Sequence, residues 1–415
     1  MNYNKMKRQL TILVMSLATA ATALAQDNHL TIDAQIRTRG EYNGGAIMPR
    51  NDGEKAALFV NERARMSLGY KNQDIELKAS VQHTGVWGQD GINQPNGRAT
   101  MNEAWGKVKF GDGFFAQLGR QQLSYDDERI LGAADWNVNG NWHDALRLGY
   151  ESPMHKVHAI VAWNQNEENV RGRYYDMTMP YKTMQTLWYH FQAETFPIGV
   201  SVIGMNLGRE SVEGTAGKMK FMQTVGTDIT LKPANLDLHG AFYYQMGQQA
   251  DGMDVQAWMA SGSAAYTFIP ELKLHAGYDY LSGNDNAGLK VKAFDALYGT
   301  HHKFYGAMDF FPGTLSTGLQ DIQGGVTSQV IKDLTLQANY HCLMVNHKLK
   351  GTDAVLGHEV DFQFTARLKK DVTLMGGYSF MLGTEAMDVI KGGNHEMWQD
   401  WGWLQLNINP RILFR

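Results

Sequence analysis

The chain has 415 residues, with 38 lysines and arginines against 42 aspartates and glutamates, so its formal net charge is −4. Charged residues make up 19% of the chain, fewer than the roughly 25% of an average soluble domain, whereas glycine (44 residues) and aromatic residues (11%) are abundant. The slightly negative charge argues against a nucleic-acid-binding protein, and the single cysteine, Cys342, excludes an intramolecular disulfide or a metal site built from several cysteines.

The N-terminal segment has the features of a secretory signal peptide. Three basic residues among the first eight precede an apolar run over residues 10–21, and the run is followed by Ala23-Leu24-Ala25. A basic region, a short apolar region and an A-x-A cleavage site have this order in such signals. The run is also shorter than the roughly 20 residues of a spanning helix. We therefore expect residues 1–25 to be a signal peptide and residues 26–415 the mature domain, with a membrane-anchoring helix as the alternative.

Beyond residue 25 the dominant pattern is an alternation of apolar and polar residues with a period of two. In residues 29–42 the even positions include Leu30 and Ile36, whereas most odd positions carry polar or charged side chains. The alternation recurs later, for example in residues 236–245 and 359–368. Such a pattern predicts β-strands with one face that tolerates charge and one that does not.

The number and length of these segments favour a membrane barrel. There are about eighteen of roughly 9–14 residues, whereas soluble strands usually have about 5–6 and membrane-spanning strands about 9–11. Eight short turns alternate with nine longer polar loops, which places both chain ends on the short-turn side. The pattern predicts an all-β fold: a transmembrane antiparallel β-barrel of about 18 strands, with short periplasmic turns and long extracellular loops, in the bacterial outer membrane.

Backbone hydrogen bonding explains why the barrel must close. Lipid offers no partner for an open sheet edge, so strands cross a bilayer only as a closed barrel, with the apolar face toward lipid and the polar face toward the lumen. A soluble β-sandwich or β-helix, whose apolar faces would cover one another, is the alternative. Aromatic residues near the strand ends are expected to form interfacial girdles; they are Tyr42, Tyr70, Phe110, Tyr150, Phe191, Tyr278, Tyr280, Tyr378 and Phe380.

The predicted lumen face of the first six strands is basic. It carries four acidic residues, Asp33, Glu41, Glu76 and Glu103, against eight basic residues, Arg37, Arg39, Arg63, Arg65, Lys78, Lys107, Lys109 and Arg147. Such a wall attracts anionic solutes and holds carboxylates through guanidinium groups. Alternatively, these cations pair with the lumen acids and stiffen the barrel. A barrel of this size is wide enough for an aqueous channel, which the long loops at residues 124–141 and 282–314 are expected to narrow.

One stretch carries a more specific signal than the alternation. Gly119-Arg120-Gln121 is followed by Asp127-Glu128-Arg129-Ile130, then by Asp135-Trp136-Asn137 and by Trp142-His143-Asp144-Ala145-Leu146-Arg147. These motifs resemble the signature of the alginate-export family of outer-membrane proteins. Residues 294–306 and 357–361 resemble two further stretches of that family, and the similarity runs from about Thr31 to the C terminus.

The resemblance implies a monomeric eighteen-stranded barrel whose narrowed, arginine-lined pore passes a polyuronate. It assigns Arg120, Arg129, Asp144 and Arg147 to the pore or its constriction. The chain departs from the family pattern at Tyr125-Asp126-Asp127, where Tyr-Gly-Asp is expected, so an extra acid lies beside the anion path. It also ends in Leu413-Phe414-Arg415, so the expected terminal aromatic residue is penultimate.

The sequence therefore predicts an outer-membrane channel, or porin, that passively conducts anionic saccharides such as polyuronates, or other small anions. The predicted pore residues are Arg37, Arg39, Arg63, Arg65, Lys107, Lys109, Arg120, Arg129, Asp144 and Arg147. A general non-selective porin is one alternative, and a structural or adhesive surface barrel plugged by its loops is another.

We expect no enzymatic activity and no cofactor. The chain has no G-x-S-x-G motif, and the adjacent His301 and His302 are expected to point to opposite sides rather than to bind one metal ion. The outer loops at Asn284-Asp285-Asn286 and at Asp52 and Glu54 are candidate sites for weak Ca²⁺ binding. The expected partners are the lipid bilayer and anionic oligosaccharides, polysaccharides or small anions, with no nucleic acid and a monomeric state.

Overall fold

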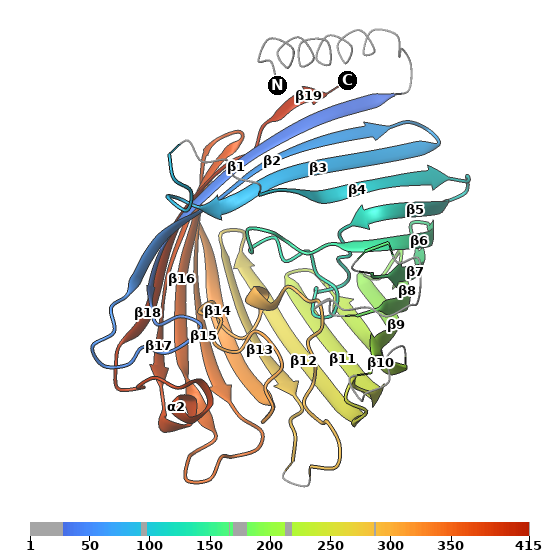
Figure 1. The fold of residues 1–415 in the computed structure, drawn as a ribbon. Coiled ribbons are helices and arrows are strands. Elements are labelled where there is room, and N and C mark those ends of the chain that lie inside the picture. The colour runs from blue at the N-terminus through green and yellow to red at the C-terminus, as the bar shows by residue number, and fades with distance from the viewer. Residues whose placement is uncertain are drawn as a thin grey trace.

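Eighteen antiparallel strands form one closed barrel in the computed structural model (Figure 1). The structure describes residues 28–92, 98–165, 167–168, 181–211, 218–285 and 288–414. The predicted signal peptide, residues 1–25, therefore lies outside the described residues. The predicted fold class is confirmed.

The strands contain 8–16 residues each, apart from the short β19. They are β1 (His29–Gly44), β2 (Ala57–Lys71), β3 (Ile75–Val86), β4 (Ala99–Lys109), β5 (Phe114–Gln121), β6 (His143–Glu151), β7 (His155–Trp163), β8 (Thr183–Gln192), β9 (Ile198–Glu210), β10 (Met219–Leu231), β11 (Leu236–Gln248), β12 (Asp254–Ile269), β13 (Leu272–Leu281), β14 (Leu319–Ile331), β15 (Leu334–Met344), β16 (Val355–Lys369), β17 (Val372–Gly383), β18 (Gln399–Ile408) and β19 (Arg411–Phe414).

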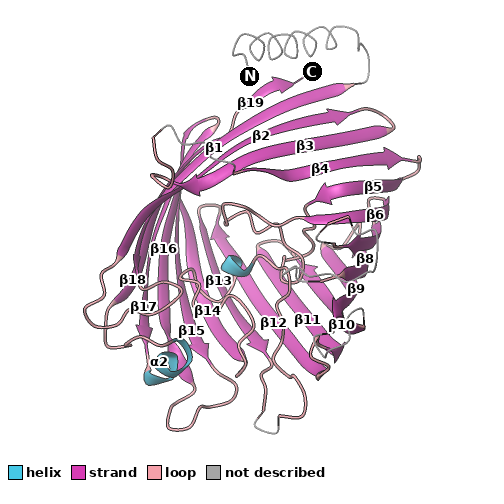
Figure 2. Ribbon diagram, viewed as in Figure 1, coloured by secondary structure: helices cyan, strands magenta, loops and turns pink. Residues whose placement is uncertain are grey.

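In the part of the chain that the structure describes, helical structure is confined to two short elements, which are cyan in Figure 2. They are the 3₁₀ helix η1 (His301–Lys303) and the α-helix α2 (Glu385–Lys391). Among the described residues, no helix has the length and apolar character that a membrane crossing would require.

The barrel closes where β1 pairs with both β18 and β19. Arg37 lies opposite Asn407 of β18, and Ile32 lies opposite Leu413 of β19. Between them, Pro410 has no backbone N–H to donate and interrupts the ladder, while its carbonyl accepts the N–H of Ala34 at 3.0 Å. We therefore count β18 and β19 as one interrupted strand, which gives the barrel eighteen.

Short turns and longer loops alternate along the whole chain. The turns at the β1 N-terminal end of the barrel are two to five residues long, as at residues 270–271 and 193–197. Asn72 stabilises one of them, because its side-chain oxygen accepts the backbone N–H groups of Asp74 and Ile75. The loops at the other end reach 37 residues, over residues 282–318. This asymmetry assigns the turns to the periplasmic side.

The barrel wall is apolar on its outer face and polar on its inner face, the reverse of a soluble protein. Outward residues at mid-strand are apolar and exposed, such as Leu118 (64%), Phe362 (48%) and Leu404 (53%). Inward residues such as Arg63 and Glu359 are polar and buried. The exposed apolar belt is the surface that lipid covers. The predicted girdle residues face outward near the strand ends, and Tyr42, Tyr278 and Tyr378 each expose 41% of their surface.

Two long loops leave the wall and lie inside the ring of strands, as Figures 1 and 2 show. They are the β5–β6 loop (residues 122–142) and the β13–β14 loop (residues 282–318), and a parallel bridge between Leu131 and Tyr298 joins them. The expectation that these loops fold inward is met.

The lumen is less polar than the alternation predicts. Buried apolar residues of the two loops pack against inward-facing residues of β7–β12, because docked loops need an apolar surface to bury. The cluster includes Leu123, Leu131, Phe294, Met308 and Phe310 from the loops, and Ile160, Met184, Met205, Met222 and Met259 from the wall.

Candidate pore constriction

One side of the lumen is basic, as predicted. The strand register places all eight predicted cations of β1–β6 on the inward face. Arg37 of β1 lies opposite Arg63 of β2, and every second residue along a strand faces the same side. Near the periplasmic end, Glu76 pairs with Lys107 (3.9 Å) and Lys109 (2.7 Å). Arg147 donates to Gln117 at 2.6 Å.

The side of the lumen formed by β10–β16 is acidic. Its inward face carries carboxylates that expose at most 5% of their surface, namely Asp228, Asp279, Asp321, Glu359 and Asp361. These strands lie about halfway around the eighteen-stranded ring from β1–β6 (Figure 1). The lumen therefore has a basic wall and an acidic wall that face each other, and the two inward loops lie between them.

The basic wall holds a short stretch of turn and bends in the β5–β6 loop, which we name the constriction segment (residues 135–139). Arg37 donates to the carbonyl oxygens of Asp135 (2.6 Å) and Asn137 (3.1 Å). Arg39 donates to the carbonyl oxygen of Trp136 at 3.2 Å. Further along the segment, the carbonyls of residues 138 and 139 accept from Arg63 and Gln82. Five consecutive carbonyls are thus bound by the wall.

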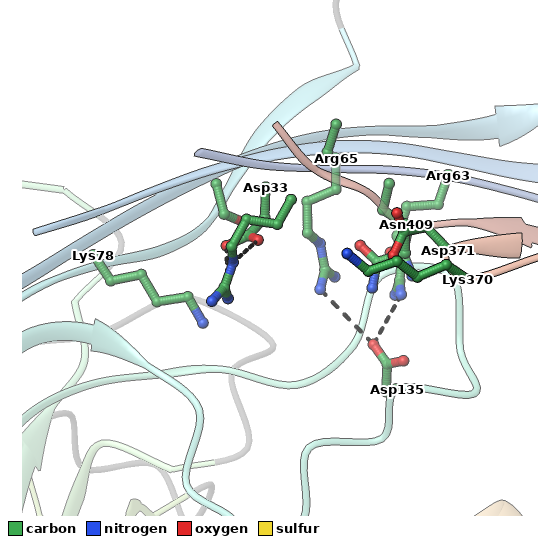
Figure 3. A pocket seen from close by; sticks show the side chains of 12 residues that line it. Asp33, Arg63, Arg65, Lys78, Asp135, Lys370, Asp371 and Asn409 are labelled. Carbon is green, nitrogen blue, oxygen red and sulfur yellow. Dashed lines mark hydrogen bonds and ion pairs between the residues drawn. The ribbon is translucent and has the colours of Figure 1, made fainter. Parts of the chain in front are cut away.

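Three guanidinium groups, which we name the arginine trio (Arg37, Arg63 and Arg65), share the carboxylate of Asp135. Arg63 lies 2.9 Å from one carboxylate oxygen and Arg65 lies 3.8 Å from the same oxygen (Figure 3). Arg37 lies 3.5 Å from the other oxygen. Since three positive charges surround one negative charge, the trio retains a positive excess.

Two cavities lie on either side of the constriction segment. The inner cavity, about 660 Å³, is lined by Asp135, Arg63 and Arg65 and reaches the β16–β17 turn at Lys370 and Asp371 (Figure 3). The outer cavity, about 680 Å³, is lined by Asn137 and Asn139 of the segment and by residues of the outer loops, Trp142, Asn164 and Tyr181 among them. The segment therefore separates a periplasmic vestibule from an extracellular one.

Trp136 fixes the segment at the meeting point of both loops and the wall. Its indole stacks on His302 of η1, with ring centroids 4.3 Å apart, and the guanidinium of Arg39 lies 3.9 Å from the indole centroid. Trp401 and Trp403 of β18 make T-shaped contacts with the same indole. The stacked cation and aromatic rings restrict the position of the neighbouring Asp135.

Arg129 anchors the same loop to the acidic wall and is not exposed to the pore. Its guanidinium pairs with Asp127 (2.7 Å) and with Asp279 of β13 (2.9 Å), and it donates to Tyr305 of the β13–β14 loop at 3.0 Å. The side chain exposes only 6% of its surface. The charge of Arg129 is used in fixing the loops, and its predicted place at the pore or its constriction stays a prediction.

Arg120 and Asp144 lie apart from the arginine trio. They are opposite each other on β5 and β6, on the outward face that also carries Leu118 and Leu146, and they pair at 2.9 Å. The inward positions beside them belong to Gln121 and His143. The two charged side chains border the outer cavity, and their predicted place at the pore or its constriction stays a prediction.

The backbone of both inward loops is strained. Nine non-glycine residues in the described part of the chain have a positive φ, and six of them lie in these loops: Asp126, Glu128, Ala134, Leu297, Tyr305 and Asp309. Such conformations persist only where surrounding contacts impose them, and they cluster at functional sites. The two loops also pack closely against each other, because a Cβ on Gly132 would lie 2.6 Å from the backbone N of Thr300.

Asp126 gives the docking of the β5–β6 loop a pH dependence. The indole N–H of Trp188 on β8 donates to its carboxylate at 3.1 Å. Burial raises the pKa of Asp126 to about 6, and neighbouring Asp228 adds to this rise in spite of a hydrogen bond from Ser201. Because an aspartate in an unfolded chain has a pKa of about 3.9, the folded protein binds this proton more tightly.

Protonation of Asp126 therefore stabilises the folded state fully below the pKa of the unfolded chain, about 3.9. This stabilisation is lost as the pH rises through the folded-state pKa of about 6. We expect the Asp126 carboxyl to raise the thermal unfolding midpoint of wild type in detergent at pH 5 relative to pH 7. Asp126→Asn, which is neutral at both pH values, should show a smaller difference between them. An equal difference in both proteins would contradict this assignment.

The candidate metal ligands already have partners within the protein. Among the described residues, one group of three potential ligands has ligand atoms within 4.8 Å, formed by Asp127, Asp228 and His239. His239 lies 2.5 Å from Asp228, and Asp127 pairs with Arg129. His301 and His302 bond to different groups, the carbonyl of Ala296 and the carboxylate of Asp309.

Three of the residues predicted to bind Ca²⁺ weakly, Asn284, Asp285 and Glu54, are engaged in loop contacts. Asp285 pairs with Lys292, and Asn284 accepts two backbone N–H groups of the same loop. Glu54 accepts the N–H of Asn51 at 2.8 Å. Asn286 lies outside the described residues. Ca²⁺ binding stays a prediction.

Sequence reasoning identified the Asp-Trp-Asn motif but did not place Asp135 or Trp136 at the constriction. It also missed Trp401 and Trp403, which lie on the inward face of β18. A signal was present for both tryptophans. They occupy the same alternate positions as Gln405 and Asn407, which the alternation assigns to the lumen.

A closed barrel with an apolar exterior, a charged lumen and inward loops defines the class of outer-membrane channel proteins. The chain belongs to the alginate export family, whose pattern matches residues 25–358. The predicted resemblance is confirmed, and the match ends within β16, short of the predicted C-terminal extent. Family and fold together place the protein in the bacterial outer membrane, as a porin-type channel.

Solved structures share the fold at low sequence identity. Pseudomonas aeruginosa OccK9 (OpdG) is similar with a TM-score of 0.65 and 13% identity, over 92% of this chain and 98% of that one. Acinetobacter baumannii OccAB1 gives 0.63 and 12%, over 92% and 97%. Pseudomonas aeruginosa OpdK, solved with vanillate, gives 0.61 and 8%, over 92% and 98%. No curated protein matches the chain in sequence.

Proposed function

We propose that this channel passively conducts anionic solutes, with carboxylated saccharides such as polyuronates as the principal class and other small anions as further solutes. The observation that carries the proposal is the arginine trio, in which three guanidinium groups of the wall share the single carboxylate of Asp135 in the constriction segment. Guanidinium groups bind carboxylates with two parallel hydrogen bonds, so they select the charge and the shape of such solutes.

The surroundings of the trio support an anion path. Lys78, Lys370 and Arg411 line the inner cavity with Arg63 and Arg65, against the acids Asp33, Asp135 and Asp371. Cations therefore outnumber acids by five to three around the vestibule. Vanillate, present in the OpdK structure, is itself a carboxylate, which makes small aromatic carboxylates reasonable test solutes beside uronates. No covalent step is required, because the gradient of the solute drives transport.

Ion selectivity in planar lipid bilayers tests the proposal. Residues 26–415, reconstituted from detergent, should give single-channel steps and a reversal potential that favours anions. Arg65→Gln should reduce the anion-to-cation permeability ratio about fivefold, the change that about 1 kcal/mol produces. Arg411→Gln is the matched control, because it removes one cation from the same cavity outside the trio. Cation selectivity in wild type, or equal effects of the two substitutions, would contradict the proposal.

A loop-plugged structural barrel is the second candidate. The apolar cluster in the lumen and the segment between the two cavities favour it, since both reduce the space open to solutes. It predicts no single-channel steps in wild type in the same bilayers. A general porin instead predicts steps with a permeability ratio close to one and equal passage of uronates and neutral sugars.

A further inference from the structure

We infer that the arginine trio is a carboxylate-binding site whose resident occupant, Asp135, is a tethered competitor that the carboxylate of a permeating solute displaces. The inference rests on the proposed function, because the displacing carboxylate belongs to the conducted solute. It assigns to Asp135 a role in setting the affinity of the site, beyond its role in shaping the constriction.

The arginines of the trio are fixed before any solute arrives. Arg63 donates to Gln35 at 3.0 Å, and Arg65 donates to Gln82 through two nitrogens at 2.9 and 2.6 Å. The side chains of Arg37, Arg63 and Arg65 expose 6%, 1% and 14% of their surface. Since the neighbouring strands hold these guanidinium groups, the site is preorganised for an anion.

The carboxylate of Asp135 is in the opposite situation. Its side chain is 56% exposed, and it lines the inner cavity beside Arg63 and Arg65 (Figure 3). Among the described residues, it is the only acid within ion-pair distance of the trio. An exposed carboxylate on buried cations has open solvent on one side, from which a second carboxylate can approach.

Displacement requires only a side-chain rotation. The backbone of Asp135 is held separately, because its carbonyl accepts from Arg37 at 2.6 Å and the next residue, Trp136, is stacked on His302. The constriction segment can therefore keep its contacts with the wall while the Asp135 carboxylate turns into the 660 Å³ inner cavity. A solute carboxylate then takes the two oxygen positions of Asp135, one shared by Arg63 and Arg65 and the other beside Arg37.

A tethered competitor gives a channel a useful affinity. Conduction requires that a solute bind strongly enough to enter and weakly enough to leave. An unoccupied site of three preorganised guanidinium groups would hold a carboxylate for long times and would block flow. Asp135, present at a high effective concentration because it is tethered, competes with the solute and speeds its release.

Asp135→Asn tests the inference through the saturation of conductance with glucuronate as the probe. The amide keeps the shape of the side chain and removes the competing charge. We expect the half-saturating glucuronate concentration to fall about tenfold, which corresponds to about 1.4 kcal/mol, and the maximal conductance to fall as well. Asp135→Glu, which restores a competing carboxylate, should bring both values back toward wild type.

Asp33→Asn is the matched control. It removes the same charge from the same inner cavity, but its partner is Arg411 (2.7 Å) and not the trio. We expect at most a twofold shift in this variant. Equal shifts in Asp135→Asn and Asp33→Asn, or no shift in either, would overturn the inference while leaving anion conduction intact. Failure of wild type to favour anions or to saturate with glucuronate would instead count against the proposed function.

Discussion

Replacing Arg129 by alanine is expected to destabilise the folded barrel by about 3–5 kcal/mol, the usual effect of removing one partner from a buried ion pair. Asp279 exposes 1% of its side chain and would remain charged and buried without its guanidinium partner. Tyr305 would lose its donor at the same time. Urea unfolding of the barrel in lipid vesicles measures the effect, which should shift the midpoint to lower urea.

The same substitution should also change conductance. Because Arg129 joins the β5–β6 loop both to β13 and to the β13–β14 loop, its loss releases one side of the constriction from the acidic wall. We expect larger and noisier single-channel currents than in wild type.

The double variant Arg129→Ala with Asp279→Asn is the control, since it removes the stranded charge and should recover part of the stability. Wild-type stability in the single variant would show that Arg129 does not anchor the loop.

The β5–β6 loop brings opposite charges to the two walls. It carries the acid Asp135 to the basic wall and the base Arg129 to the acidic wall, only six positions apart. Each contact neutralises part of the charge on one wall and so reduces the repulsion between its like-charged side chains. The loop is therefore held across the lumen in one orientation, with the constriction segment on the side where anions are attracted.

The wall of the barrel was predictable because lipid and lumen impose opposite chemistry on alternate residues. That rule placed Arg63 and Arg65 on the lumen face correctly. The same rule, applied to the motif residues, separates Asp144 from Arg147, since residues an odd number of positions apart in one strand face opposite sides. The motif established the family, but only the alternation determines the face.

The contacts of the inward loops could not be predicted from local pattern. Arg129 and Asp279 are 150 positions apart, and Arg37 lies 98 positions before Asp135. Such pairs are set by how the closed barrel folds, and nothing in the neighbouring residues specifies them. One indirect signal was present in β7 and β9, where inward positions such as Ile160 and Met205 are apolar. Strands apolar on both faces indicate that protein, and not water alone, covers the lumen side.

A charge on the lipid face of mid-barrel should be nearly as damaging as the loss of Arg129. Phe362 lies at the centre of β16, faces outward and is 48% exposed to the region that lipid occupies. Phe362→Arg is expected to destabilise the barrel by about 2–4 kcal/mol, the range for arginine at the bilayer midplane. Urea unfolding in vesicles of defined thickness gives the value.

Gln363→Arg supplies the matched comparison one residue further along the strand. Gln363 lies opposite Gln337 and Gly377 on the inward face, where Asp361 is the preceding inward residue. A guanidinium there meets water and a buried carboxylate, so we expect a change within about 1 kcal/mol. Because the two positions differ by one residue, a shift of the strand register by one would exchange the two effects. Equal destabilisation by both substitutions would be incompatible with a wall that has one lipid-facing and one lumen-facing side.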